Sequence, residues 1–388
     1  MDNTKTPLVA ITAGDPNGIG YEVIIKSLTD PHITEVCTPV IYGNEQLFKE
    51  WQKQLGEEYA ALHVNIIRNA EEAQAGKISL INTHANMALH IGTSTKEGGE
   101  ASFAALNKAC DDIKRGAVKA LITAPINKEN IQSDRFRFSG HTEYLANRFG
   151  KESESLMMMV SEQMKVALVC NHVPLRDVAE QITEERIVSK LKVFNESLIQ
   201  DFHIRAPRIA VLALNPHAGD NGLLGTEEQT IIKPAIKQAY DSGILAFGPF
   251  TADGFFGSGT YAHFDATLAM YHDQGLIPFK SLDMNGVNYT AGLPVVRTSP
   301  DHGTAYDLAG KRQATHFSFA NALYLALDIL KKREITKEIN KNPLPFKEQQ
   351  PEKREPREFK GFNPAEARRE REERQREEIK NDTLKNEN

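Results

Sequence analysis

Short apolar segments alternate with amphipathic helical patterns along most of the chain, and this alternation is the strongest constraint on its fold. An apolar run over 7–13 is followed by helical spacing over 19–28, and similar units recur up to a last helix predicted over 316–332. Further strands are predicted over 38–42, 78–81, 120–124, 208–214, 267–271 and 288–296, and further helices over 98–115, 183–202 and 227–242. Strands that alternate with helices predict an α/β protein with a mainly parallel sheet. Only a polar turn separates the runs 156–160 and 165–170, which predicts an antiparallel pair and therefore a mixed sheet.

The charged residues are distributed unevenly, and their distribution separates a body from a tail. Residues 341–388 contain 13 Lys+Arg and 12 Asp+Glu, whereas the first 340 residues contain 33 and 40 and carry a net charge of −7. A mildly acidic body lacks the basic footprint of a nucleic-acid-binding protein. The segment 340–388 begins with four prolines and continues with dense Arg and Glu, so we expect a disordered tail or a lone helix.

The sequence shows no sign of a membrane or secreted protein. No apolar run approaches the roughly 20 residues that a membrane-spanning helix needs, and the first residues lack the pattern of a signal peptide. Cys37, Cys110 and Cys170 are odd in number and widely spaced, which predicts buried thiols and no disulfides. We therefore expect a cytoplasmic protein.

Three histidines follow apolar strands at their carboxyl ends: His172, His217 and His272. In this class of fold the carboxyl ends of parallel strands face the ligand crevice. Three imidazoles from different strands are therefore candidates to converge on one catalytic divalent metal with open coordination positions. Asp220 and Asp273 follow two of them and are suited to orient an imidazole. A structural or capping role for each histidine is the alternative, because a chain with 12 His places some of them after strands by chance.

Other polar residues occur in loops of the same kind. His141 and Thr142 open a predicted helix whose free N–H groups suit an anion, with a plain N-cap as the alternative. Lys280, Asn288 and Arg297 lie among apolar neighbours, and Arg suits bidentate binding of a carboxylate or a phosphate. Solvated strand ends or an internal ion pair with a nearby aspartate are the alternatives for these three.

The loop 13–20 follows the first strand and has the position of a phosphate-binding loop. Its sequence is neither the Gly-x-Gly-x-x-Gly dinucleotide fingerprint nor a Walker A motif. We expect it to form a tight turn that places Asp15 and Asn17 at the crevice.

Eight segments, taken together and in this order, resemble the 4-hydroxythreonine-4-phosphate dehydrogenase family of vitamin B6 biosynthesis. They are ITAGDPNGIGYEV (11–23), LITAPINK (121–128), FSGHTEYLA (138–146), NHVPLRDV (171–178), LALNPHAGDNGLLGTEE (212–228), GPFTADGFF (248–256), MYHDQGLIPFK (270–280) and GVNYTAGLPVVRTSPDHGTAYDLAGK (286–311). They span nearly the whole body, about 1–335, and the agreement of all eight is specific. The charged tail has no counterpart in the family pattern.

The resemblance implies a homodimer that depends on NAD, with NADP as the alternative, and on one divalent metal ion per active site: zinc, magnesium, cobalt or manganese. It places the metal ligands on His172, His217 and His272. It places the substrate-binding residues on His141, Thr142, Lys280, Asn288 and Arg297. The active site is then expected in an inter-domain cleft at the dimer interface, with ligands from both subunits.

The fold implied by the resemblance is similar to that of the isocitrate and isopropylmalate dehydrogenases, with two α/β/α domains and mixed, mainly parallel sheets. A cofactor-binding signature of those enzymes matches HGTAYDLAGK (302–311) and would place NAD on His302, Gly303, Thr304, Ala305 and Asp307. The first α/β domain would be discontinuous, 1–130 and 297–335. The second domain, 131–296, would carry dimer contacts and most metal and substrate ligands, and 340–388 would lie outside both.

The implied reaction is oxidation of 4-phosphooxy-L-threonine at its 3-hydroxyl to a 3-keto acid, which decarboxylates to 3-amino-2-oxopropyl phosphate on the way to pyridoxal phosphate. Lys280 and Asp253 are the candidates for the catalytic group that accepts the hydroxyl proton. One alternative is a dehydrogenase of phosphorylated sugar acids, erythronate or threonate 4-phosphate. A second is a metallohydrolase that uses the three histidines to activate water. In each case the expected partner is a small molecule, with no nucleic acid and no membrane.

Overall fold

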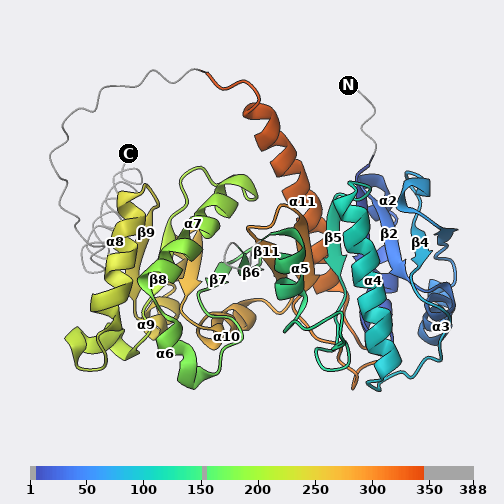
Figure 1. Ribbon diagram of the computed structural model, residues 1–388, viewed down its shortest axis with the longest axis horizontal. Coiled ribbons are helices and arrows are strands. Elements are labelled where there is room, and N and C mark those ends of the chain that lie inside the picture. The colour runs from blue at the N-terminus through green and yellow to red at the C-terminus, as the bar shows by residue number, and fades with distance from the viewer. Residues whose placement is uncertain (1–5, 151–154, 345–388) are drawn as a thin grey trace, which may run out of the picture. The chain divides into compact units, whose positions relative to one another are not determined.

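Twelve strands form one continuous mixed sheet in the computed structural model, which describes residues 6–150 and 155–344 (Figure 1). The strand order is β3-β4-β2-β1-β5-β12-β11-β6-β7-β10-β8-β9. The strands are β1 Leu8–Thr12, β2 Thr38–Gly43, β3 Asn65–Ile67, β4 Ser79–Asn82, β5 Ala120–Thr123, β6 Leu156–Val160, β7 Lys165–Leu168, β8 Ile209–Leu212, β9 Ala246–Phe250, β10 Ala266–Ala269, β11 Val287–Ala291 and β12 Val296–Pro300.

The sheet is mainly parallel, and its antiparallel contacts are confined to the centre. Neighbouring strands pair in parallel from β3 to β12 and from β7 to β9. The contacts β12–β11, β11–β6 and β6–β7 are antiparallel. The predicted α/β class with a mixed sheet is therefore confirmed, and so is the antiparallel pair of β6 and β7.

Helices cover the sheet and connect its strands. They are α1 Gly20–Leu28, α2 Ile33–Val36, α3 Glu45–Leu55, α4 Lys96–Lys114, α5 His141–Phe149, α6 Val178–Gln181, α7 Glu184–Gln200, α8 Lys233–Asp241, α9 Ala252–Gly257, α10 His272–Leu282 and α11 Phe317–Ile339. Side-chain caps fix several of their first turns. Asn44 accepts hydrogen bonds from two backbone N–H groups at the start of α3, and Thr95 and Thr183 each accept one at the starts of α4 and α7.

Alternate residues of the buried strands enter cores on opposite faces of the sheet. In β1, Val9 and Ile11 belong to one apolar cluster and Ala10 to the other. This is the two-residue periodicity of a strand that is covered on both faces. The packing continues past the ends of several strands, where Ala13, Ala124 and Met270 are buried in the first of these clusters.

One predicted strand is wrong. The run 288–296 is two antiparallel strands, β11 and β12, which pair Asn288 with Ser299. Gly292 between them has a φ of +79°, a conformation that favours glycine, and Pro294 cannot donate a ladder hydrogen bond. The chain therefore reverses direction inside the apolar run.

The strand order also groups the sequence. Strands from 1–130, together with β12, make up one half of the sheet, and strands from 131–296 make up the other. Backbone contacts gather residues 1–341 into one compact unit, so the division into two domains stays a prediction. The predicted tail lies outside the described residues from 345 onward.

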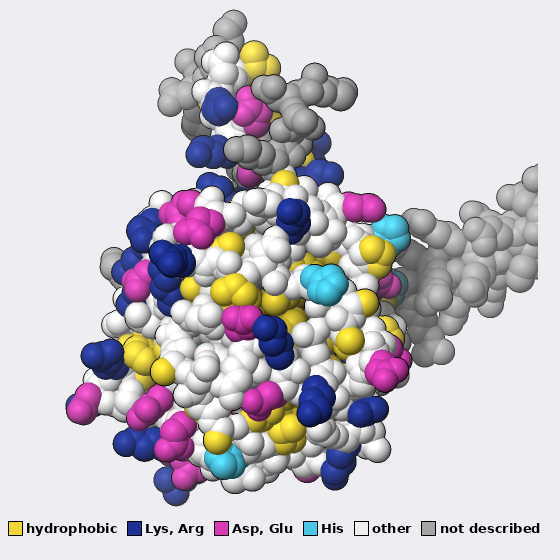
Figure 2. All heavy atoms as spheres, turned by 90° about the vertical axis from the view of Figure 1, so that its right-hand side faces the viewer, with side chains coloured by type: hydrophobic (Ala, Val, Ile, Leu, Met, Phe, Trp, Pro, Cys, Tyr) yellow, Lys and Arg dark blue, Asp and Glu magenta, His cyan; other side chains and the backbone are white. Residues whose placement is uncertain are grey.

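The helices and one outer face bear on the expected absence of membrane and nucleic-acid partners. None of the helices in the described ranges is long and apolar enough to cross a membrane. On the face shown in Figure 2, Lys and Arg side chains are interspersed with Asp and Glu side chains. Charges of one sign therefore do not dominate that face.

Candidate active site

A cavity of about 370 Å³ is bordered by β5, β11, β12, α5 and α10. It brings together nine residues that the sequence singled out: His141, Thr142, His172, His272, Lys280, Asn288, Arg297, His302 and Gly303. The other five, His217, Asp253, Thr304, Ala305 and Asp307, do not line it. The cavity shows which of these side chains are neighbours, while the role of each stays a prediction.

Two of the predicted metal ligands, His172 and His272, lie side by side. His172 follows β7, His272 begins α10 directly after β10, and these two strands are parallel neighbours. Their ring centroids are 5.8 Å apart. The Nδ1 atom of His272 lies 2.7 Å from Oδ1 of Asp273, the orienting contact expected from the sequence. Burial and then the ammonium of Lys128 lower the pKa of His172, which favours the neutral imidazole that binds metals.

The third histidine, His217, is exposed and lies in the segment Pro216–Gly222. Residues 217–221 all have positive φ, between 40° and 78°, so the loop after β8 curls in the left-handed sense. The buried carboxylate of Glu228 accepts hydrogen bonds from the N–H groups of Leu214 and Asn215, at 2.9 and 2.7 Å, and holds the start of this loop. Within the described ranges, no group of three His, Cys, Asp or Glu side chains is placed to hold a metal ion. One chain alone therefore brings together two of the three imidazoles.

Arg297 is the most unusual charged residue of the cavity. Its side chain is 3% exposed, and its guanidinium donates to the hydroxyls of Thr123 at 2.8 Å and Thr290 at 3.3 Å. Among the residues that the structure describes, no carboxylate forms an ion pair with it, and its Nε has no partner. Burial lowers its pKa to about 10, and the charge of Glu143 partly opposes this. A buried cation without a counter-ion is costly unless a ligand supplies the negative charge.

The amino end of α5 faces the same cavity. His141 and Thr142 are its first residues, and Gly140 at the N-cap supplies no side-chain cap. Burial lowers the pKa of His141 well below its usual value, and the charges of Arg297 and Lys128 lower it further. His141 is therefore neutral near pH 7, and its Nε2 is buried without a partner.

Unpartnered polar atoms recur around the cavity. Arg297 Nε, His141 Nε2, Asn288 Oδ1 and His302 Nε2 are all buried, and none has a hydrogen-bond partner in the described parts of the protein. Buried polar atoms in native proteins are nearly always hydrogen-bonded. Four exceptions around one cavity indicate a site that a polar ligand completes.

Three charged residues of the cavity were not singled out from the sequence: Lys128, Glu143 and Asp301. Asp301 Oδ2 lies 3.2 Å from Nζ of Lys280. Glu143 lies 4.0 Å from Nδ1 of His172. Lys128 and Asp301 follow β5 and β12, which are parallel neighbours. The signal that could have found them is the one that found the histidines, a polar residue just after a buried strand.

The predicted cofactor loop is held by the first loop of the chain. The N–H of Ile19 donates to the carbonyl of Thr304 at 2.9 Å, and a Cβ on Gly18 would stand 2.6 Å from that oxygen. Ala305 has a φ of +43°, and Asp307 is exposed. Of this segment, only His302 and Gly303 line the cavity.

The expectation that Asp15 and Asn17 lie at the crevice is wrong, because both are fully buried. Asp15 accepts hydrogen bonds from Tyr306 at 2.8 Å and Asn130 at 2.7 Å. Asn17 accepts one from the N–H of His90 at 2.9 Å. These side chains join loops from four parts of the sequence, and neither lines the cavity.

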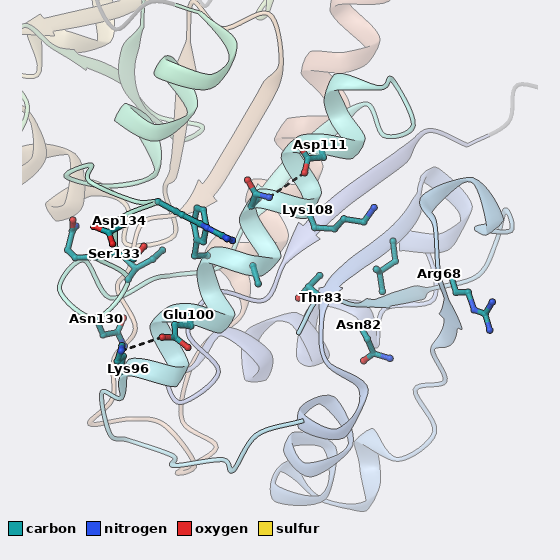
Figure 3. Close-up of a pocket in the computed structure, with 17 residues that line it drawn as sticks. Arg68, Asn82, Thr83, Lys96, Glu100, Lys108, Asp111, Asn130, Ser133 and Asp134 are labelled. Carbon is teal, nitrogen blue, oxygen red and sulfur yellow. Dashed lines mark hydrogen bonds and ion pairs between the residues drawn. The ribbon is translucent and has the colours of Figure 1, made fainter. Parts of the chain in front are cut away.

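A second, larger cavity of about 670 Å³ lies along α4 and contains none of the predicted site residues (Figure 3). Some of its polar side chains contact one another. Lys96 lies 3.7 Å from Glu100, and Asn107 donates to Asp111 at 3.3 Å. The chemistry is assigned to the first cavity, because nine of the residues singled out from the sequence line that cavity and none lines this one.

The fold and the first cavity define an α/β protein in which the buried cation Arg297 and the two adjacent imidazoles of His172 and His272 line one cavity. The family model described as "Pyridoxal phosphate biosynthetic protein PdxA" matches residues 35–326. The chain belongs to this family.

Relatives and solved structures agree with that assignment. A 4-hydroxythreonine-4-phosphate dehydrogenase of Bacteroides thetaiotaomicron is 50% identical over 338 residues, which cover 87% of this chain and 92% of the relative. A protein of the same name from a Sulfurihydrogenibium species is 42% identical over 320 residues, 82% of this chain and 97% of the relative. The crystal structure of the Klebsiella pneumoniae enzyme of that name has a TM-score of 0.73 at 35% identity and covers 84% of this chain and 100% of its own. These similarities indicate a dehydrogenase.

Proposed function

We propose that the chain is an NAD-dependent and metal-dependent dehydrogenase of 4-phosphooxy-L-threonine that acts in vitamin B6 biosynthesis as a homodimer. It would oxidise the 3-hydroxyl to a 3-keto acid, which loses its carboxylate because the ketone accepts the electrons, leaving 3-amino-2-oxopropyl phosphate. The observation that carries the proposal is the buried, unpaired guanidinium of Arg297 in a cavity that also holds two adjacent imidazoles. The names of the relatives specify the substrate.

Substrate binding follows from the charges of the cavity. Arg297 and Lys280 would neutralise the phosphate and the carboxylate of the substrate, since guanidinium and ammonium groups form strong charge-assisted hydrogen bonds with both. Asn288 Oδ1 and His141 Nε2 are buried without partners and would fix the orientation of the bound molecule together with Thr142. The contacts with Arg297, Asn288 and His141 would satisfy atoms that have no hydrogen-bond partner in the described parts of the chain.

His172 and His272 are suited to bind a divalent metal, and they are the two ligands that one chain brings together. His172 and His272 are imidazoles of adjacent strands, and burial favours the neutral form of His172. A divalent metal bound there supplies Lewis-acid chemistry, which lowers the pKa of a coordinated hydroxyl. We propose that His217 of the partner subunit is the third ligand, because His217 is exposed on its loop and the neighbouring Leu223 and Leu224 are exposed apolar side chains.

The segment 302–307 would hold the nicotinamide cofactor, which serves as the hydride acceptor when bound. The fit rests on His302, whose buried Nε2 is unpartnered and whose neighbour Gly303 also lines the cavity. The N–H of Ile19 fixes the backbone of this segment through Thr304. Thr304, Ala305 and Asp307 would then contact parts of the cofactor that lie outside the cavity.

Lys280 is better placed than Asp253 to receive the hydroxyl proton. Lys280 lines the cavity, and Asp301 holds its Nζ at 3.2 Å. Asp253 is exposed in α9 and does not line the cavity of its own chain. We therefore assign proton transfer to Lys280 Nζ, which would accept the hydroxyl proton as a neutral amine after passing its own proton to Asp301, a carboxyl whose pKa burial raises.

Subunit mixing tests the shared site. His217→Ala and His172→Ala should each abolish NADH formation while the fold survives, as judged by circular dichroism. If the site is shared, a mixed dimer of the two variants contains one intact site. Random mixing should then restore about a quarter of wild-type activity, because half of the dimers are mixed and each has one active site of two. No recovery in dimers shown to have exchanged subunits would contradict the shared site, and an active His217→Ala homodimer would remove His217 from the metal set.

A further inference from the structure

The cations of the cavity differ in how they are paired. Lys280 has Asp301 as its counter-ion at 3.2 Å. Arg297 has the charge of Glu143 nearby. Lys128 has no carboxylate within 4.0 Å in the described parts of the chain, and its one hydrogen-bonding neighbour there is Nε2 of His172 at 3.5 Å. Three cations line the cavity, and of these Lys128 and Arg297 form no ion pair in the described parts of the chain.

Lys128 lies beside the amino end of α5. Its Cε lies 3.6 Å from where a Cβ on Gly140 would stand, so its side chain runs alongside the N-cap. The first N–H groups of a helix have no intrahelical acceptor, and they carry the positive end of the helix dipole. No side chain caps them in α5. The free ammonium and the free N–H groups therefore point to the same kind of ligand, an oxyanion.

Arg297 supplies a second, independent observation. It is 3% exposed, it lines the same cavity, and its Nε has no partner. Lys128 and Arg297 both depress the pKa of His141, the first residue of α5, so their charges act at the same helix end. Two cations and a helix amino end form the arrangement that phosphate dianions favour.

Glu143 is the one group that opposes an anion here. Its Oε2 would lie 3.5 Å from a Cβ on Gly140, and its side chain is 18% exposed. In the ligand-free chain this carboxylate supplies negative charge near Arg297 and Lys128. A bound phosphate would replace it in that role, and Glu143 would stay beside Nδ1 of His172, 4.0 Å away.

We propose that Lys128 is a further substrate-binding residue, which receives the phosphate of the substrate at the amino end of α5 together with Arg297. The assignment rests on the proposed function for the identity of the phosphorylated substrate, but binding of phosphate itself requires neither NAD nor turnover. Lys280, already paired with Asp301, is left for the carboxylate and for proton transfer. The 3.5 Å contact between Lys128 Nζ and His172 Nε2 is long for a hydrogen bond, so a contact with phosphate oxygens can replace it.

Titration of the full-length dimer with inorganic phosphate, in the presence of a metal chelator, tests this proposal. Lys128→Met keeps the length of the side chain and removes the charge, and should weaken phosphate binding at least about tenfold, as expected for loss of a charge-assisted contact. Lys128→Arg should restore binding to within a few-fold of wild type. The matched control is Lys237→Met, an exposed lysine of α8 paired with Asp241 at 2.5 Å, which should leave phosphate binding unchanged.

A second arm separates the two oxyanions of the substrate. L-threonine carries the carboxylate and no phosphate, and its binding should be the same in Lys128→Met and in wild type. The proposal is overturned if Lys128→Met binds phosphate as wild type does, if wild type shows no saturable phosphate binding, or if L-threonine alone is affected. In kinetics with phosphohydroxythreonine, Lys128→Met should raise KM more than it lowers kcat. If phosphate binding behaves as proposed but no substrate yields NADH, the function fails and the phosphate site stands.

Discussion

Replacing Arg297 by methionine should stabilise the ligand-free protein while it abolishes binding of the anionic substrate. The guanidinium is 3% exposed and no described carboxylate pairs with it, so the folded chain carries an uncompensated buried charge. Methionine keeps an unbranched side chain of similar length and removes that charge. The opposite signs of the two effects distinguish a ligand-binding residue from a structural one.

The magnitude follows from the environment of the side chain. Burial lowers the pKa of Arg297 to about 10, which corresponds to roughly 3 kcal/mol against the charged form in the folded chain. Two hydrogen bonds, to Thr123 and Thr290, are lost in the variant and offset this by about 1 kcal/mol each. We expect a net gain of roughly 1 kcal/mol, which raises Tm by about 1–2 °C for a body of this size.

Scanning calorimetry with and without inorganic phosphate measures both effects. In phosphate-free buffer, Arg297→Met should melt slightly above wild type. Phosphate should raise the Tm of wild type and leave that of the variant unchanged, because only wild type binds the anion. Arg297→Lys is the control: it keeps the charge but loses the planar donor arrangement, so it should gain no stability. An Arg297→Met protein that is destabilised by several kcal/mol and still responds to phosphate would refute the reasoning.

Three further predictions concern acid stability, a buried network and the tail. His141 has a pKa well below the usual value, chiefly through burial and then through Arg297 and Lys128, so the unfolded chain takes up this proton first as the pH falls. The free energy of unfolding should therefore drop as the pH falls below about 6.5, and His141→Asn should flatten that slope in urea titrations. Asp201 accepts hydrogen bonds from Tyr289 and Arg333, each at 2.6 Å, and Asp201→Ala should cost about 3 kcal/mol in urea unfolding because it leaves the buried hydroxyl of Tyr289 and the half-buried guanidinium of Arg333 without their carboxylate. Deletion of 341–388 should leave NADH formation unchanged, because the described residues that line the cavity all lie between 123 and 303, and a large drop would show that the tail takes part.

The fold could be predicted from the sequence because the two periodicities are strong. The apolar runs of β1, β2 and β5 are buried on both faces and are separated by helices, so the parallel class followed directly. The polar turn around 161–164 correctly predicted the antiparallel pair of β6 and β7. The run 288–296 was predicted as one strand because apolar content alone does not show where the chain reverses direction. Gly292 and Pro294 form the turn there.

The histidines show how far strand ends predict a site. His172 and His272 follow β7 and β10, which are parallel neighbours, and they lie together. His217 follows β8, the other neighbour of β10, so the same argument predicted that it would join them. It does not do so within one chain, where the left-handed loop held by Glu228 leaves His217 exposed and outside the cavity. Such a loop depends on a buried carboxylate that lies 11 residues further along the sequence, which no local pattern reveals.

The sequence also could not predict which charged side chains of the site pair with one another. Lys128 and Asp301 follow neighbouring strands, as the histidines do, but only the structure shows that Asp301 pairs with Lys280 and that Lys128 is left without a carboxylate. Arg297 was singled out in the sequence because its neighbours are apolar. The structure adds that its guanidinium is buried and donates hydrogen bonds to the hydroxyls of Thr123 and Thr290. Pairing depends on side-chain directions from separate elements, and these are set by the packing of the whole sheet.

The measurement that tests the central claim most directly is NADH formation by the full-length protein, with phosphohydroxythreonine compared against erythronate 4-phosphate and threonate 4-phosphate. Each substrate is assayed with and without a metal chelator. The account predicts chelator-sensitive NADH formation with phosphohydroxythreonine and much slower turnover of both sugar acids. Faster turnover of a sugar acid would change the substrate. NADH formation that is unaffected by removal of the metal would contradict the role of His172, His217 and His272.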